Sequence, residues 1–528
     1  MEIKGLPMFT NKKSLLALSV ASAVALSGCG SDKDNNEPVA PVVPPVVVVV
    51  PPQAAAEITS VVVGSVVDSA TSDVVAAKVS FLEAGVAATN LVDLEGNAVT
   101  SMDLEDGSFS FVVKDGASVS QVTAIVSADE YVTKSYVINL ATLSEGDVNV
   151  QLPLVSQDTD GVASSSSEAA VSGGSSADPI TASIADGKAN ASVTVPAGTI
   201  LQDAEGNAIT GSSLKLKVTA ADTSTSAGSS ITPQGLNVAG STSILKPVGV
   251  ASVEMSDETG VKVKKFSQPI TVSMAIPASK GVQTGDELSL SSQNEDTGVW
   301  SAETQKVTVG SLMAADNYYN ASFETDHLTF FAATEVKDSC TAPIRILTTG
   351  DAIPASGLIV SFSSDDLNSS DRITADDTVV SADNVASDDT AMVTVKDAEG
   401  NVWFESASEV AVCGDINVAL ASTVTYVSES FAINGTCSNG AEESFVASGA
   451  AVYYKREGKA QKRAMGDGAG NYALNDLVSG ETYSLTATFS GELASIEKLT
   501  ASVTADDTDE SASVSFECST TTGSTGGN

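Results

Sequence analysis

Histidine is almost absent from this chain of 528 residues, since His327 is the only one. Metal sites built on several histidines are therefore excluded, and any catalytic group that needs an imidazole has to use this residue. Aromatic residues make up only 5% of the chain. After the first 30 residues, no apolar run is long enough to span a membrane.

Positive charge is also scarce: 26 Lys and Arg face 67 Asp and Glu, which gives a net charge of −41. A chain this acidic repels nucleic acids, so we expect no nucleic-acid partner. Calcium is the only cofactor that the sequence gives a reason to consider, because calcium binds carboxylate oxygens. The candidate ligands are the pairs Asp365–Asp366, Asp376–Asp377 and Asp388–Asp389. Their spacing matches no calcium loop, so we expect a solvated acidic surface, no metal site and no cofactor.

Only five cysteines are present, and the first of them carries the strongest motif. Lys12 and Lys13 precede the apolar run Leu15–Leu26, and small residues then lead into Cys29. This is the layout of a secretory signal peptide, and the run is too short to cross a bilayer comfortably. The alternatives are a signal peptide with a chance cysteine or a short hydrophobic anchor.

The segment Leu26-Ser27-Gly28-Cys29 resembles the lipobox of bacterial lipoproteins. The resemblance implies that Cys29 is acylated, with palmitate among its lipids, and becomes the mature N-terminus at a membrane. Gly30, where an Asp would favour inner-membrane retention, implies the outer membrane of a diderm bacterium. The body would face the periplasm or the cell surface.

The other four cysteines predict disulfides, because an even number in an exported protein favours pairing. Three pairings are possible. We prefer Cys340–Cys413 with Cys437–Cys518, because each bond would then join the first and last strands of one domain. Loops of this size gain about 4 kcal/mol each in the chain-entropy model.

Alternating apolar and polar residues, as in Ser108–Val112 and Leu214–Val218, predict strands almost throughout. The predicted fold class is all-β: tandem antiparallel β-sandwiches after a lipoprotein signal peptide and a Pro-rich linker. The predicted segments are a signal peptide (1–28), an acylated Cys and Pro/Val-rich linker (29–56), a sandwich (57–155), a Ser/Gly-rich linker (156–179), a larger sandwich (180–336), two disulfide-bonded sandwiches (337–432 and 433–518) and a disordered tail (519–528).

Two sandwiches resemble a known family. Gly64–Asp68, Asp106–Phe111 and Ala128–Val132 in the first, and Gly470–Leu474 and Leu477–Ala487 in the last, resemble the carboxypeptidase regulatory-like family. That family consists of small sandwiches related in shape to transthyretin. The strand order of 180–336 is similar to the sandwich modules of ankyrin- and netrin-receptor-type proteins and to the cleavage segment of adhesion receptors.

A five-residue pattern with Asp first and Gly-Asn last recurs along the chain. Asp and Gly-Asn supply turn geometry, so the pattern predicts hairpin turns. It occurs in Asp93–Asn97, Asp203–Asn207, Asp397–Asn401 and, in part, Asp467–Asn471.

His327-Leu328-Thr329 is the one candidate for catalysis. Adhesion-receptor cleavage segments resemble it, which implies His327 as the base, Thr329 as the nucleophile and breakage of the Leu328–Thr329 bond. The alternative is a structural histidine beside a final strand, with Leu328 and Phe330 packed inward.

These features predict a non-catalytic cell-envelope lipoprotein that projects β-sandwiches for structural or adhesive binding. The membrane, through the N-terminal lipid, and a glycan or envelope protein would be its partners. One alternative is a self-processing protein cleaved at Leu328–Thr329. The other is a glycan-binding accessory lipoprotein, with Trp300 and Trp403 as candidate ligand-binding residues for carbohydrate.

Overall fold

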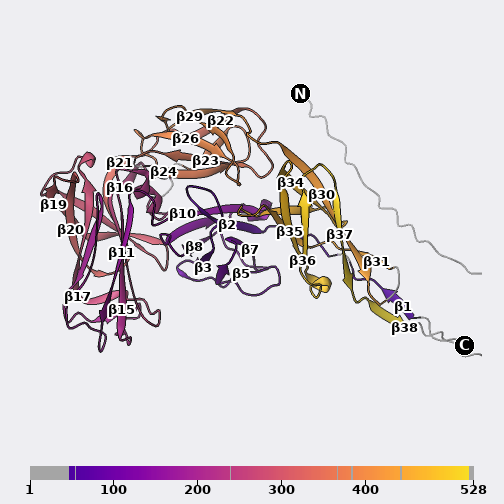
Figure 1. Ribbon diagram of the computed structural model, residues 1–528, viewed down its shortest axis with the longest axis horizontal. Coiled ribbons are helices and arrows are strands. Elements are labelled where there is room, and N and C mark those ends of the chain that lie inside the picture. Colours follow the sequence, from indigo (N-terminus) through magenta and orange to yellow (C-terminus); the bar gives the residue numbers. More distant parts are fainter. Residues whose placement is uncertain are drawn as a thin grey trace, which may run out of the picture. The chain divides into compact units, whose positions relative to one another are not determined.

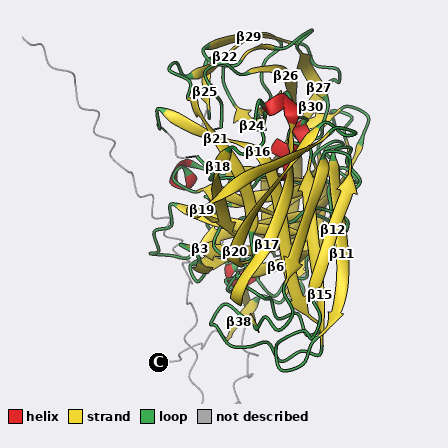
Figure 2. Cartoon of the chain, turned by 90° about the vertical axis from the view of Figure 1, so that its left-hand side faces the viewer, coloured by secondary structure: helices red, strands yellow, loops and turns green. Residues whose placement is uncertain are grey.

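The computed structural model describes residues 47–53, 55–237, 240–365, 367–381, 384–439 and 443–522. The predicted signal peptide, Cys29 and most of the Pro/Val-rich linker lie outside these residues, as does the tail from 523 on. Nearly all of the regular secondary structure in the described chain is β-strand, as the all-β prediction requires (Figures 1 and 2). None of its helices is long and apolar enough to cross a membrane.

Residues Val49–Thr521 form one compact unit. Four β-modules follow one another within its described residues, and we name them module 1 (57–155), module 2 (162–338), module 3 (340–422) and module 4 (426–518). Each has a hydrophobic core of its own. Two short strands lie at the chain's described ends, β1 (Val47–Val50) and β38 (Ser519–Thr522).

Module 1 is a sandwich of two sheets, ordered β10-β2-β7-β5 and β4-β3-β8-β9, with β6 paired to β3. Phe109 and Phe111 alternate with serines along β7 and both point into the core, as predicted, where they pack against Phe81. Its elements are β2 (Val62–Asp68), β3 (Ala77–Glu83), β4 (Val86–Ala87), β5 (Leu91–Val92), β6 (Ser101–Leu104), β7 (Ser108–Val113), β8 (Gln121–Ser127), β9 (Lys134–Asn139), η1 (Leu143–Glu145) and β10 (Val148–Leu154).

Module 2 is a single 11-stranded sheet ordered β11-β15-β16-β21-β18-β19-β20-β17-β13-β12, with β14 paired to β17. The end strands β11 and β12 contact each other, so the sheet curls around one core. Its elements are β11 (Val162–Ala170), β12 (Ile180–Asp186), β13 (Ala189–Val195), β14 (Leu201–Gln202), β15 (Ser213–Ala221), α1 (Ser226–Ile231), β16 (Ser243–Asp257), β17 (Lys265–Pro277), η2 (Ala278–Lys280), β18 (Glu287–Asn294), β19 (Val299–Met313), β20 (Tyr318–His327) and β21 (Phe330–Asp338).

Strand β11 corrects the predicted flexible linker at 156–179. Residues 162–170 pair with β15 along their whole length, from Val162 opposite Ala221 to Ala170 opposite Ser213. Val162 and Ala163 are buried, and the following serines alternate between half-buried and exposed positions. The serine-rich composition predicted a linker, and that prediction is wrong for residues 162–170. Backbone pairing with β15 makes this segment part of the sheet.

Module 3 packs a three-stranded sheet, β25-β22-β29, on a five-stranded one in which β24-β23-β26-β27 is extended by β28. Its strands are β22 (Ile344–Gly350), β23 (Leu358–Ser363), β24 (Asn368–Ile373), β25 (Thr378–Val380), β26 (Thr390–Lys396), β27 (Val402–Glu405), β28 (Val410–Ala411) and β29 (Asp415–Leu420).

Module 4 is an eight-stranded sheet ordered β31-β30-β34-β33-β32-β35-β36, with β37 paired to β30. Its elements are β30 (Tyr426–Cys437), β31 (Ser444–Val446), β32 (Ala451–Lys455), β33 (Lys462–Gly466), β34 (Asn471–Val478), β35 (Thr482–Thr488), η3 (Gly491–Leu493), β36 (Leu499–Thr504) and β37 (Glu510–Phe516).

Modules 1, 3 and 4 share one feature that the prediction of purely antiparallel sandwiches did not include. In each, the first and last strands pair in parallel: β2 with β10, β22 with β29, and β30 with β37. The disulfides Cys340–Cys413 and Cys437–Cys518 are both present and lie beside two of these pairs, with Cα–Cα distances of 5.5 and 5.4 Å. Cys340 and Cys413 lie just before β22 and β29, and Cys437 ends β30 while Cys518 follows β37, so each bond cross-links one end of the parallel pair.

The four repeated Asp-to-Asn segments are hairpin turns, as predicted. In Asp397–Asn401, the Asp397 carboxylate accepts hydrogen bonds from the Asn401 backbone and side-chain nitrogens at 2.8 Å each, and Gly400 has a φ of +88°. Such a φ favours glycine. The other three turns repeat this hydrogen bonding.

The predicted linker and tail each contain a strand. Val47–Val50 forms β1, consistent with four successive β-branched residues, and Ser519–Thr522 forms β38 at the start of the predicted disordered tail. The chemistry discussed below lies in the four modules.

Candidate functional site: a polar cleft

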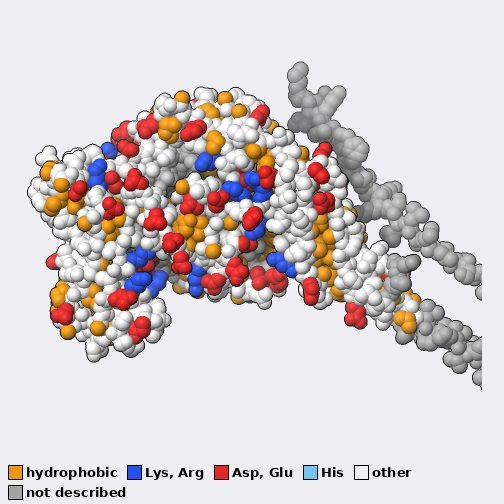
Figure 3. Space-filling view, viewed as in Figure 1, with side chains coloured by type: hydrophobic (Ala, Val, Ile, Leu, Met, Phe, Trp, Pro, Cys, Tyr) orange, Lys and Arg blue, Asp and Glu red, His pale blue; other side chains and the backbone are white. Residues whose placement is uncertain are grey.

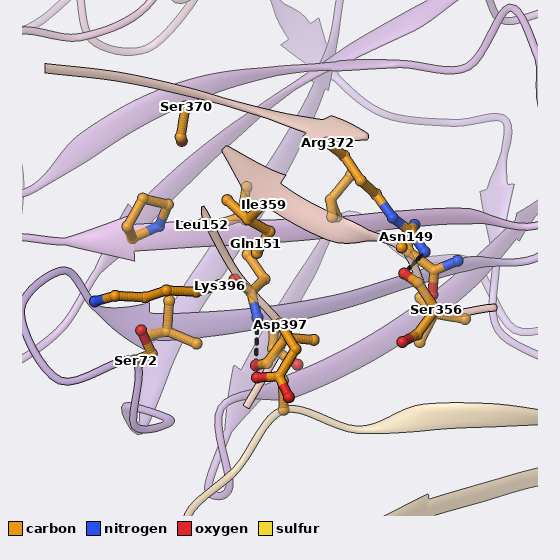
Figure 4. Close-up of a pocket in the computed structure, with 18 of the residues that line it drawn as sticks. Ser72, Asn149, Gln151, Leu152, Ser356, Ile359, Ser370, Arg372, Lys396 and Asp397 are labelled. Carbon is orange, nitrogen blue, oxygen red and sulfur yellow. Dashed lines mark hydrogen bonds between the residues drawn. The ribbon is translucent and has the colours of Figure 1, made fainter. Parts of the chain in front are cut away.

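A cleft of about 530 Å³ in the described residues is lined by modules 1, 3 and 4, with Ser230 and Gln234 of module 2. Its walls are β2, β9 and β10 of module 1, β23, β24 and the Lys396–Ala398 segment of module 3, and the β32–β33 hairpin of module 4 (Figure 4). The volume falls in the usual range for small-ligand sites, about 300–1,000 Å³.

Strand alternation places polar side chains in this cleft. On β10, Leu152 and Leu154 are buried, while Asn149 and Gln151 on the other face remain at least partly exposed. On β24, Ser370 and Arg372 share one face, and Ile373 is buried. The sandwich pattern itself, with one apolar face per sheet, therefore places amides and hydroxyls in the cleft, beside apolar side chains such as Ile359 and Met465.

Three cations line the cleft without a carboxylate salt bridge among the described residues. The Arg372 guanidinium donates to the Ser356 carbonyl, and burial lowers its pKa. Lys134 Nζ donates to the Ser230 carbonyl at 2.7 Å, and burial lowers its pKa to about 8. The Lys396 side chain makes no hydrogen bond or ion pair with the part of the chain that the structure describes.

The carboxylates of the cleft, in contrast, are all engaged by protein groups. Asp147 accepts from Arg463 at 2.6 Å, and Asp476 accepts from the Ser356 backbone N–H at 2.6 Å. Asp68, Asp371 and Asp397 accept from nearby backbone N–H groups. Five aspartates and five Lys or Arg side chains line the cleft, so the formal charges of the lining balance in a chain whose net charge is −41. Figure 3 shows Lys and Arg side chains gathered in this part of the surface.

A basic hairpin, residues 455–463, holds the walls of the cleft together. This hairpin belongs to module 4, and its cations bond to carboxylates of modules 1 and 3. Figure 1 shows β34 and β35 of module 4 near module 1. The partners are Lys455 with Asp106, Lys459 with Asp73, Arg463 with Asp147, and Arg456 and Lys462 with Glu399.

Glu399 is the centre of this network. Its side chain is 1% exposed, and it lies 2.5 Å from Arg456 Nε and 2.6 Å from Lys462 Nζ. The Tyr483 hydroxyl donates to it at 3.2 Å. Glu399 belongs to one of the repeated hairpin turns, whereas the matching Glu95 and Glu205 are exposed. One copy of a common turn has thus become the contact between modules 3 and 4.

The structure separates His327 from Thr329. The imidazole Nδ1 lies 3.1 Å from Thr325 Oγ1, and Nε2 lies 3.3 Å from Glu303. Thr329 is buried, and its hydroxyl has no hydrogen-bond partner in the described residues. Leu328 is buried in the module 2 core. This is the arrangement of the structural alternative, and the hydrogen bond needed for a base and its nucleophile is not formed.

The two tryptophans are also placed as structural residues. Trp403 is 4% exposed in the module 3 core and stacks on Tyr426, with ring centroids 5.7 Å apart. Trp300 donates its indole N–H to the Gln234 carbonyl at 3.0 Å and packs edge-on against Phe330. The prediction of Trp403 as an exposed sugar platform is therefore wrong, because its ring is covered by the core.

The described acidic pairs bond to protein groups. Asp376 accepts from Thr348 N at 2.7 Å, Asp377 pairs with Arg345, and Asp389 lies 2.6 Å from Lys246. Asp366 lies outside the described residues. Among those that are described, no group of three or more His, Cys, Asp or Glu could hold a metal ion.

Sequence reasoning missed the cleft, because its residues come from modules far apart in the chain. One usable signal was present: five of the 26 basic residues fall within Lys455–Arg463. Such clustering in a strongly acidic chain indicates a surface that pairs with carboxylates.

A smaller hollow of about 250 Å³ lies over β15 and β16 of module 2. Glu295 lines it, 3.7 Å from Lys264 Nζ, and burial raises the pKa of this carboxyl to about 7. Glu254 acts in the same direction, and Lys264 and Lys262 oppose it.

Glu295→Gln should stabilise module 2 at pH 8 and leave it unchanged at pH 4. Because the folded pKa lies above the unfolded one, the wild type loses stability as pH rises from about 4.5 to 7. A shift of this size corresponds to about 3 kcal/mol. Thermal unfolding followed by Trp300 fluorescence, with Trp403 replaced by Phe, measures it. Equal pH profiles for wild type and variant would contradict this assignment.

Comparisons with known proteins identify no family for the chain. No protein-family model matches it, and no curated protein matches it. Solved structures to which it is similar include the Bacillus anthracis TIE protein, at 9% identity over 76% of this chain and 55% of that chain, with a TM-score of 0.14. The chain thus spans about half the length of that protein.

Two pilins are similar at the same level. The Streptococcal ancillary pilin matches at 9% identity over 44% of this chain and 93% of that chain, with a TM-score of 0.15. The major pilin subunit BcpA of Bacillus cereus matches at 8% identity over 86% and 99%, with a TM-score of 0.13. Likenesses this weak carry no conclusion about fold or function.

Proposed function

We propose that this chain is a non-catalytic lipoprotein of the bacterial outer membrane that displays four β-modules for adhesive or structural binding. The observation that carries the proposal is the Leu26-Ser27-Gly28-Cys29 segment behind its basic and apolar stretch. An acyl-modified Cys29 would anchor the body to a membrane, and none of the helices in the described residues is long and apolar enough to cross one.

The four modules support a binding role. Two disulfides and the ion pairs of the basic hairpin fix the modules, which suits a protein that works outside the cytoplasm. His327 is bonded to Thr325 and lies beside Glu303 rather than Thr329, so the described geometry favours binding over self-cleavage.

Glycan binding is the second candidate, and the cleft favours it. Its walls present amides and hydroxyls, which both donate and accept hydrogen bonds as sugar hydroxyls do. The glycan would then bind in the cleft, and not on Trp403 as the sequence suggested.

Cell fractionation tests the anchor. Full-length protein expressed in a diderm bacterium should sediment with outer membranes and partition into detergent. The Cys29→Ala variant, which cannot be acylated at this position, should do neither. Protease added to intact cells then shows which side the modules face. Wild-type protein found entirely in the soluble fraction would overturn the proposal.

A further inference from the structure

We propose that the cleft between modules 1, 3 and 4 binds an acidic oligosaccharide, whose charged groups pair with Arg372 and Lys396 and whose hydroxyls bond to the amides and hydroxyls between them. This names a ligand class for the display function proposed above. The binding site itself stands on the cleft alone.

Charge is the first argument. Arg372, Lys396 and Lys134 have no carboxylate salt bridge within the described residues, although acidic residues far outnumber basic ones in the chain. The five aspartates of the lining already accept protein hydrogen bonds. An anion entering the cleft would therefore find three cations that no carboxylate already pairs, in a lining whose formal charges balance.

The spacing of these cations is the second argument. Figure 4 shows Arg372 and Lys396 at opposite sides of the cleft, with Gln151 and Ile359 between them. A ligand that carries several charged groups along a chain can pair with both cations at once. Guanidinium groups bind carboxylate and sulfate oxygens in a bidentate geometry, and ammonium groups act as point charges.

The hydrogen-bonding groups are the third argument. Asn149 and Ser370 make no side-chain hydrogen bond with the described residues, and both line the cleft. Amides and hydroxyls match the mixed donors and acceptors of a sugar. In the proposed complex, Asn149 and Ser370 bind the sugar hydroxyls, and Arg372 and Lys396 bind the charged groups.

An acidic peptide fits the same walls less well. A peptide that binds in extended form adds to a free strand edge. Three strands that end their sheets line the cleft: β9, β10 and β24. On β10, Pro153 has no N–H to donate, and the Gln151 side chain donates Nε2 to the Ala398 carbonyl at 2.9 Å. Pro153 thus makes β10 a poor edge for the addition of a peptide strand.

The cleft is also preorganised. Arg463 with Asp147 and Glu399 with Arg456 and Lys462 tie its walls together without using Arg372 or Lys396. Little ordering is then left to a ligand, which reduces the cost of binding. A variant at Lys396 should consequently change affinity and leave the fold intact.

Calorimetric titration of the detergent-solubilised full chain tests the proposal, with tetragalacturonate and a heparin-derived tetrasaccharide as acidic probes. We expect at least one to bind, with an affinity that falls as salt rises, and maltotetraose not to bind. Lys396→Ala should weaken binding at least tenfold, Lys396→Glu should abolish it, and Lys78→Ala, at an exposed lysine of β3 outside the cleft, should leave it unchanged.

Three results would overturn the proposal. They are failure of both acidic probes to bind, equal binding by Lys396→Glu and wild type, and tighter binding of tetraglutamate, which would assign the cleft to an acidic peptide. Unchanged melting temperatures for the Lys396 variants show that lost affinity is not lost folding. Because the titration uses solubilised protein, a negative result leaves the membrane anchor untouched, and failed anchoring leaves the cleft untouched.

Discussion

Glu399→Ala should destabilise the contact between modules 3 and 4 by about 3–5 kcal/mol. The substitution leaves Arg456 and Lys462 without the buried carboxylate that both contact, and removing one member of a buried ionic cluster costs about this much. The Tyr483 hydroxyl loses an acceptor as well. The same substitution at an exposed turn position should change stability by less than about 0.5 kcal/mol.

The repeated turn supplies that control within the chain. Glu205 occupies the same position of the Asp203–Asn207 turn and is exposed, so Glu205→Ala has the same chemistry without the buried partners. Urea unfolding followed by Trp403 fluorescence, in a Trp300→Phe background, reports on module 3, which contains Glu399. Equal midpoints for the Glu399 and Glu205 variants would show that the ionic cluster does not hold these modules.

Replacing Cys340 and Cys413 together by serine should lower the stability of module 3 by about 4 kcal/mol. The bond closes a loop with a sequence separation of 73 residues, and cross-links of this span restrict the unfolded chain by about that amount. It also lies beside the parallel pair β22–β29, so its loss frees both the first and the last strand.

Trp403 fluorescence during urea unfolding measures this effect too, since Trp403 lies in the module 3 core. The double variant Cys437→Ser and Cys518→Ser is the matched control, because it removes the bond of module 4 and leaves module 3 intact. If the two double variants shifted the Trp403 transition equally, the stabilisation would not be local to the bonded module.

Local patterns predicted the strands and the turns. Phe109 and Phe111 alternate with serines, and Asp397 to Asn401 carries its own turn hydrogen bonds, so each of these structures follows from a few neighbouring residues. The disulfide pairing followed from module boundaries that the same patterns indicated. Short-range chemistry therefore accounts for most of the fold.

Features that depend on contacts between residues far apart in the sequence could not be predicted in this way. The serines of β11 carry no apolar alternation strong enough to predict a strand, and only their pairing with β15 makes them one. Trp403 carries no local sign that the module 3 core covers it. The cleft combines Lys134 of module 1 with Arg372 and Lys396 of module 3, and no sequence window contains them all.

Metabolic labelling with palmitate tests the central claim, that a lipid on Cys29 holds these modules at the outer membrane. In a diderm bacterium producing the full chain, wild-type protein should incorporate label and sediment with outer membranes, while Cys29→Ala should incorporate none. Cys340→Ser with Cys413→Ser, which removes two other cysteines, should be labelled like wild type. Equal labelling of wild type and Cys29→Ala, or no label in either, would contradict the account.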